Sequence, residues 1–285
     1  MKVFISVDME GISGLVRWMD VASQGIDFHI NRRLMTADTN AAIAGAFDAG
    51  ATEVIVEENH GVEDLCVLLM EEVDPRCEVI RGAGRPGATT MSGLTSDVGV
   101  VLLVGHHARA GSFPGIMAHT ISGTWFARVL LDQKPIGEPD FFSLRAGELG
   151  IPVGMVSGDQ IVAEQVLAFA PNAETAIVKH ALAHQSARCI PPERARPIIQ
   201  ASAYAAVEKA RAGSLSLRPD QDRPYSFELE LKKPLTDHMS ANLEQLKEFE
   251  IIDDRRVKTH ADDMDLGFRR CAYLGFADLP GITRY

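Results

Sequence analysis

The sequence predicts an α/β protein with a largely parallel central sheet flanked by helices and a smaller C-terminal α+β lobe. Short β-branched runs alternate with segments of helical periodicity through the first half of the chain. The run at 98–104 is apolar throughout, as expected for a strand buried on both faces. After Val104 this alternation gives way to a stretch rich in Gly, Ala, Ser and Pro.

The first half is expected to form strands and helices in turn. The strands are predicted at residues 2–7, 53–57, 78–81 and 98–104, and the helices at 31–49, 62–72 and 90–94. The helix at 31–49 has apolar residues at helical spacing and ends at Gly50, a residue that commonly terminates helices. In a parallel sheet of this kind, ligands bind beyond the carboxyl ends of the strands.

The second half begins with a predicted hairpin, whose strands at 124–131 and 134–136 flank Asp132-Gln133. Further strands are expected at 151–156 and 226–231, helices at 160–168, 192–212 and 240–248, and a last strand–helix pair near the end. The Pro-containing link at 217–224 suggests a boundary between a core at 1–215 and a lobe at 216–285. One continuous domain is the alternative.

Composition excludes some partners. The 285 residues have a net charge of −11, which offers no basic surplus for nucleic acid and disfavours an anionic membrane surface. Asp8 and Glu10 interrupt the N-terminal apolar stretch that a secretion signal would need, and the longest apolar runs are too short to span a bilayer. We therefore expect a cytoplasmic protein in which the four well-separated cysteines are reduced.

Acidic and imidazole groups follow three of the predicted strands. They are Asp8 and Glu10 after the first strand, Glu57, Glu58 and His60 after the second, and His106 and His107 after 98–104. Parallel strands would bring these groups to one edge of the sheet, and Glu138 could return another carboxylate to it. Mixed oxygen and nitrogen donors favour zinc, manganese or cobalt, so the pattern indicates a metal site.

Each of these residues also has a structural interpretation. A carboxylate after a strand is more often a turn or cap residue than a ligand, and Glu57 and Glu58 are expected to be a solvated strand end. The GxGxxG pattern at 82–87 has no acidic residue at the end of the next strand to bind a ribose, so a dinucleotide site is not expected. That segment is predicted to be a loop, with Arg81 or Arg85 facing substrate.

The segment Ser6-Val7-Asp8-Met9-Glu10-Gly11 resembles the SxDxEG signature of the D-aminopeptidase family, peptidase family M55. The resemblance covers at least residues 1–190 in the right order. Its further motifs are Glu58-Asn59-His60, 105–109, 114–119, 135–138, Gly147 to Val153, Ser157-Gly158-Asp159 and Val178-Lys179.

The resemblance implies two Zn²⁺ ions per chain, with Mn²⁺ or Co²⁺ as alternatives. Asp8 would bridge the ions, Glu10 and His107 would complete one site, and His60 and Glu138 the other. His119 matches the catalytic histidine of the family.

Two positions depart from the family pattern. His106 stands where the family often has an aromatic residue, and it is expected to be structural or to support a ligand. Pro139-Asp140 follow Glu138 where the family usually has Leu-Gly, and the downstream copy Gly147–Gly150 makes Glu148 an alternative ligand. The roles of Asp159 and Lys179 stay open.

The implied activity is that of a metallo-aminopeptidase. It would hydrolyse the N-terminal amide bond of short peptides or amino-acid amides, with D-amino acids favoured by the resemblance. Metal-bound hydroxide would attack and His119 would transfer a proton, although His119 as the nucleophile stays open. The resemblance also implies a homodecamer of two stacked five-membered rings. Alternatives are an L-aminopeptidase or amidase, a dinuclear phosphoesterase, and a peptide-binding protein without catalysis.

Overall fold

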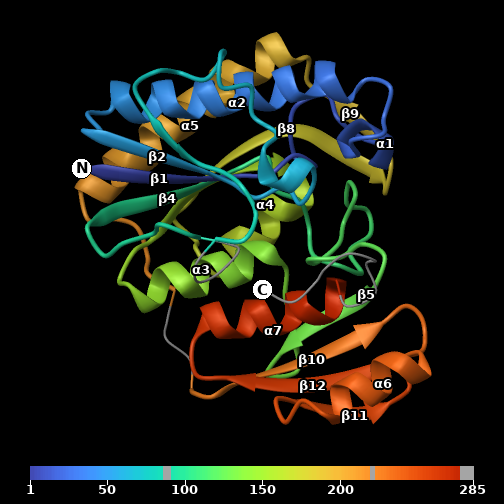
Figure 1. Ribbon diagram of the computed structural model, residues 1–285. Helices are drawn as coiled ribbons and strands as arrows, with labels where there is room; N and C mark the ends of the chain where they lie inside the picture. Colours follow the sequence, from blue (N-terminus) through green and yellow to red (C-terminus); the bar gives the residue numbers. More distant parts are fainter. Residues whose placement is uncertain (86–90, 219–221, 277–285) are drawn as a thin grey trace.

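The computed structural model describes residues 1–85, 91–218 and 222–276, which form two sheets with helices around them (Figure 1). Sheet A has the strand order β3-β2-β1-β4-β7-β8-β9. Its strands are β1 (Lys2–Val7), β2 (Glu53–Glu58), β3 (Glu78–Ile80), β4 (Val98–Val104), β7 (Val153–Asp159), β8 (Glu174–Ala183) and β9 (Ser186–Cys189). β9 returns antiparallel to β8, whereas the other pairings are parallel. The predicted fold class is confirmed.

Helices cover both faces of sheet A, and β1 shows why. Val3, Ile5 and Val7 point to the face covered by α2 (Phe28–Asp48) and α5 (Pro192–Arg211), whereas Phe4 points to the opposite face. The opposite face is covered by α3 (Glu138–Glu148), below the strands in Figure 1, and by α4 (Gln160–Leu167). A strand buried on both faces needs apolar residues at most positions, as β1 and β4 have.

Sheet B is antiparallel, with the order β11-β12-β10-β5-β6. It comprises β5 (Phe126–Leu131), β6 (Lys134–Pro135), β10 (Tyr225–Leu231), β11 (Phe249–Asp253) and β12 (Arg256–Ala261), with α6 (Asp237–Glu244) beside them. Asp132 and Gln133 both have positive φ, as a tight hairpin turn requires, and the predicted hairpin is confirmed.

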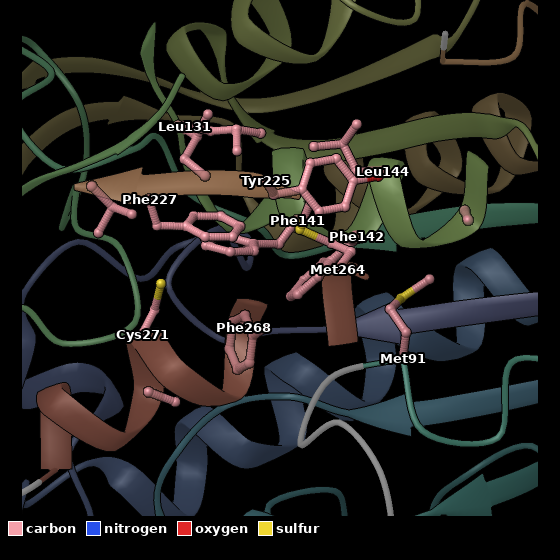
Figure 2. Packing of buried hydrophobic residues seen from close by; sticks show 14 of the residues in the cluster. Met91, Leu131, Phe141, Phe142, Leu144, Tyr225, Phe227, Met264, Phe268 and Cys271 are labelled. Carbon is pink, nitrogen blue, oxygen red and sulfur yellow. The ribbon is translucent and has the colours of Figure 1, made fainter. Parts of the chain in front are cut away.

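An aromatic cluster joins sheet B to α3 and α7 (Met264–Phe276), as Figure 2 shows. Phe141 of α3 stacks on Phe227 of β10 at a centroid distance of 5.6 Å. Phe268 of α7 meets Phe141 edge to face at 5.2 Å. β5 and β6 come before the suggested boundary at residue 215, whereas β10, β11 and β12 come after it, so sheet B takes strands from both sides. The division into 1–215 and 216–285 stays a prediction.

Two predicted helices are absent from the described residues. The segment 62–72 forms only a 3₁₀ turn, Glu63–Leu65, with positive φ at Asp64 and Leu65. In the predicted helix 90–94, the described residues 91–94 are non-helical, and Met91 has positive φ. Both segments give backbone amides to buried carboxylates of β2, as described below, and these contacts replace helical hydrogen bonds. Residue 90 lies outside the described residues.

The sequence patterns did not predict α1 (Trp18–Val21), β8, β9 or α3. All four cysteines are free thiols. Among the described helices, none has both the length and the apolar character needed to cross a membrane.

Candidate metal centre

Three loops meet at the carboxyl edge of sheet A. Asp8 and Glu10 follow β1, His60 follows β2, and His107 follows β4. β1 lies between β2 and β4, so successive strands are added on opposite sides of β1, and open α/β sheets bind ligands at such a point. Two glycines allow the loops to approach closely, because neither has a side chain. A Cβ atom on Gly11 would collide with His106 O, and one on Gly105 would collide with Asp8 O.

The Asp8 carboxylate lies between two imidazoles. Its Oδ1 is 3.3 Å from His60 Nδ1, and its Oδ2 is 3.3 Å from His107 Nε2. Glu10 Oε2 lies 3.1 Å from His60 Nδ1, and Glu138 Oε1 lies 3.5 Å from His107 Nε2. The five ligands implied by the resemblance are therefore together and buried. Their contacts pair Glu10 with His60 and Glu138 with His107, which differs from the implied allocation to the two ions.

The histidines turn one ring nitrogen toward backbone and the other toward the carboxylates. His60 Nε2 lies 2.8 Å from Val21 O, His107 Nδ1 3.0 Å from Ala108 O, and His119 Nδ1 2.9 Å from Met117 O. A carbonyl oxygen only accepts, so each of these nitrogens carries a hydrogen. The lone pair of the other nitrogen faces the carboxylates, where it can hold a proton or a metal ion. This is the usual arrangement of histidines that ligate metals.

These lone pairs face negative oxygens, which is unfavourable unless a cation or proton lies between them. Asp8 Oδ2 and His107 Nε2 are buried without a hydrogen-bond partner, a rare condition for buried polar atoms. Burial lowers the pKa of His60, but Glu10 and Asp8 outweigh this and hold it well above its ordinary value. The centre thus attracts positive charge. A divalent cation on each side of Asp8 would satisfy these groups, and the mixed donors suit zinc.

Of the two glutamates at the ends of α3, Glu138, at its first position, is the one that reaches this centre. Its Oε1 accepts a hydrogen bond from Ile121 N at 2.7 Å and lies 3.9 Å from His119 Nε2. Glu148, the alternative, stands at the other end of α3 and accepts from Met264 N at 2.8 Å. Its partners Tyr225 and Arg145 also lie outside the centre, so the geometry favours Glu138.

His119 lies beside the five acidic and imidazole residues. Its ring stacks on His107 at a centroid distance of 3.9 Å, and its side chain is 11% exposed. Burial, and then the neighbouring His107, lower the pKa of His119, which favours the neutral ring. With Nδ1 committed to Met117, Nε2 is free to take up and release a proton.

Two polar residues support this arrangement. His106 Nδ1 lies 3.9 Å from Asp8 Oδ2, while its ring meets Phe142 edge to face. Asp159 caps α4 by accepting from Ile161 and Val162 amides. Its second oxygen accepts from Ile116 N at 2.8 Å and so tethers the loop that leads to His119. Both oxygens of Asp159 accept hydrogen bonds from backbone amides, so its carboxylate has a structural role.

The prediction that Glu57 and Glu58 form a solvated strand end was wrong. Both are fully buried, and burial raises the pKa of Glu57 to about 8. Glu57 accepts from the Met91 and Ser92 amides and pairs with Arg85 at 3.0 Å. Glu58 accepts from Val67 and Leu68 amides and pairs with Arg81 at 3.2 Å. Arg81 and Arg85 therefore pair with buried carboxyl groups, whereas one or the other was predicted to face substrate.

Lys179 of β8 fixes the loop that carries Glu10. The fully buried Nζ donates to Glu10 O at 2.6 Å, Ile12 O at 2.8 Å and Leu15 O at 2.6 Å. These contacts use every donor of an ammonium group. Burial lowers the pKa of Lys179 to about 8, so the group is still mostly charged at pH 7. Lys179, whose role the sequence left open, therefore positions the loop that carries Glu10.

Lys179→Met is expected to loosen this loop, because Met keeps the bulk of Lys but leaves three carbonyls without a donor. Each unsatisfied buried group costs on the order of 1–3 kcal/mol. We expect a lower melting temperature and a weaker hold on divalent metal, measured by thermal denaturation and metal analysis. Lys247→Met is the matched control, since Lys247 is exposed. Unchanged melting and metal content in Lys179→Met would show that the three contacts contribute nothing.

Comparison with known proteins agrees with this geometry. The family model described as D-aminopeptidase, peptidase family M55, matches residues 1–271. A D-aminopeptidase from Bacillus subtilis (strain 168) is 34% identical over 226 residues, which is 79% of each chain. The solved structure of the zinc-dependent D-aminopeptidase DppA from Bacillus subtilis, described as a self-compartmentalizing protease, superposes with a TM-score of 0.87 at 28% identity and covers 100% of both chains.

The family match spans the loops that carry the metal-centre residues, the loop with His119 and the described strands of sheet B. The aminopeptidase class expected from the sequence motifs is thereby confirmed. The chain belongs to the D-aminopeptidase family, peptidase family M55.

Proposed function

We propose that this chain is a dinuclear zinc aminopeptidase that hydrolyses the N-terminal amide bond of short peptides and amino-acid amides with a D-residue at the amino terminus. The observation that carries the proposal is the Asp8 carboxylate between His60 and His107, with imidazole lone pairs turned toward carboxylates on both sides. The similar Bacillus subtilis protein is zinc-dependent, which supports zinc as the metal.

Asp8, Glu10, His60, His107 and Glu138 would hold the two ions, with Asp8 shared between them. The allocation of Glu10 with His107 and of His60 with Glu138 to separate ions stays a prediction. When bound, zinc supplies an acidified water for attack and a Lewis acid for the scissile carbonyl. The protein's own side chains would carry out the proton transfer.

His119 would move the proton. Met117 O holds Nδ1–H, so Nε2 would act as a base that accepts a proton from the attacking water and then passes that proton to the leaving amine. The stacked His107 ring covers one face of His119 and limits its rotation. Burial of the centre keeps bulk water from competing for this proton.

The test is a side-by-side assay of the purified, zinc-loaded protein. Its substrates are D-alaninamide, L-alaninamide, D-Ala-D-Ala, L-Ala-L-Ala and phenyl phosphate. The proposal expects turnover of the D-amide and D-dipeptide, much slower turnover of the L-compounds, and loss of activity on chelation that zinc restores. Faster turnover of the L-compounds would contradict the stereochemistry. Hydrolysis of phenyl phosphate alone, or of nothing, would contradict the reaction itself.

The similar protein of known structure is described as self-compartmentalizing. We propose by extension that this chain assembles into a homodecamer. Light scattering of the purified protein should then give ten times the mass of one chain. A monomer or dimer at micromolar concentration would contradict the proposed decamer but would leave the proposed reaction unaffected.

A further inference from the structure

Trp18, the first residue of the short helix α1, lies directly beside His119. Its ring meets the His119 ring edge to face at a centroid distance of 5.3 Å. A Cβ atom on Gly123 would lie 3.2 Å from Trp18 Cη2 and 3.6 Å from His119 Cβ, so the indole also packs against the Gly123 backbone. The Trp18 side chain is nevertheless 37% exposed. A large aromatic ring thus combines a buried edge at the centre with a surface open to a ligand.

Polar contacts hold the backbone on both sides of Trp18. Asp20 accepts from Val16 N and Arg17 N and pairs with the Arg17 guanidinium at 2.6 Å. Trp18 N donates to Gln185 Oε1 at 3.1 Å. The same helix ends at Val21, whose carbonyl orients His60. α1 therefore links the backbone of Trp18 to the carbonyl that contacts His60, and this places the indole beside the metal centre.

The orientation of His119 decides which part of a substrate meets this ring. A group that receives a proton from Nε2 must lie within about 2.6–3.2 Å of it. Under the proposed mechanism that group is the leaving amine, so the atoms attached to this amine lie next to the imidazole. An indole whose centroid is 5.3 Å from the imidazole is then within reach of the side chain on the leaving residue.

We infer that Trp18 is a specificity-determining residue that contacts the residue after the scissile bond and favours an apolar or aromatic side chain there. This inference rests on the proposed function, because it takes His119 as the donor to the leaving amine. An exposed aromatic face gains free energy by burial against an apolar side chain but gains nothing from an ammonia leaving group. Trp18 therefore discriminates among peptides by their second residue.

The test compares three substrates with zinc-loaded wild type and Trp18→Ala: D-alaninamide, D-Ala-Gly and D-Ala-D-Phe. The readout is the ratio of kcat/KM for D-Ala-D-Phe to that for each of the other two. Trp18→Ala is expected to lower both ratios by ~10-fold, mainly through KM, as follows from losing roughly half of the burial of one apolar side chain. Trp18→Phe should recover most of the preference.

Met19→Ala is the matched control, because Met19 is the neighbouring residue in α1 and is 49% exposed. Its ratios should equal those of wild type. Ratios in Trp18→Ala within about two-fold of wild type would overturn the inference, including the case in which all three substrates slow equally because Trp18 only positions His119. If wild type hydrolyses none of the three, the proposed function fails as well, so the two failures are distinguishable.

Discussion

Asp8→Ala is expected to lose bound zinc and to lower kcat/KM toward D-alaninamide by ~10³-fold or more, since attack and carbonyl polarisation both depend on the metal. Asp8 is the one carboxylate whose two oxygens face the two halves of the centre, at 3.3 Å from His60 and 3.3 Å from His107. Its removal therefore affects both halves at once. Metal analysis and the amide assay give the two readouts.

The control for this substitution is Asp254→Ala, because Asp254 is an exposed acidic residue in the turn between β11 and β12. It should retain full metal and activity. An Asp8→Ala protein that keeps its zinc and turns over the amide would show that Asp8 is not shared between ions. The fold itself should survive, since sheet A keeps its apolar core without this side chain.

His119→Ala is expected to keep its zinc and lower kcat by ~10²–10⁴-fold, the usual contribution of a positioned acid or base. The reason is geometric: Nε2 of His119 is 3.9 Å from Glu138 Oε1, whereas His60 Nδ1 lies 3.1 Å and His107 Nε2 3.3 Å from a carboxylate oxygen. His29→Ala, on the exposed surface of α2, is the control and should behave as wild type.

A second substrate separates the possible roles of His119. D-alanine p-nitroanilide has a leaving group that needs little protonation, so proton donation by His119 matters less for it. The loss on His119→Ala should be clearly smaller for the anilide than for D-alaninamide. Equal losses would contradict proton donation to the leaving amine and favour a nucleophilic role. Loss of zinc together with activity would instead make His119 a ligand.

Much of the site could be predicted because parallel sheets impose a simple rule. Asp8, His60 and His107 follow different strands, and parallel pairing of β1 with β2 and β4 brings those strand ends to one edge. The choice of His107 over His106 came from the resemblance. It agrees with the structure, in which His107 Nε2 is 3.3 Å from Asp8 and His106 Nδ1 is 3.9 Å away.

The burial of Glu57 and Glu58 could not be predicted because their partners come from distant loops. A carboxylate at a strand end resembles a solvated residue until Arg81, Arg85 and loop amides enclose it. The same contacts explain why the segment 62–72 does not form the predicted helix. Glu58 binds backbone amides of that segment, which is held in a non-helical conformation. Local periodicity contains no information about such long-range pairing.

The start of α3 could have been recognised. Pro139 stands in its first turn, and Gly137 N donates to Asp140 Oδ2 at 2.9 Å, an arrangement typical of helix N-termini. The departure from the family pattern after Glu138 therefore preserves a helix start, and Glu138 stays beside His107. Trp18 had no such signal, because its importance depends on the approach of α1 to His119.

The central claim is that one buried carboxylate organises a two-ion centre. The most direct measurement is the metal content of the purified chain after saturation with zinc and removal of the excess. About two zinc ions per chain are expected for the wild type, since Asp8 has an imidazole on each side. Asp8→Ala is expected to lose both. A wild-type value of one ion or none would contradict the two-ion centre.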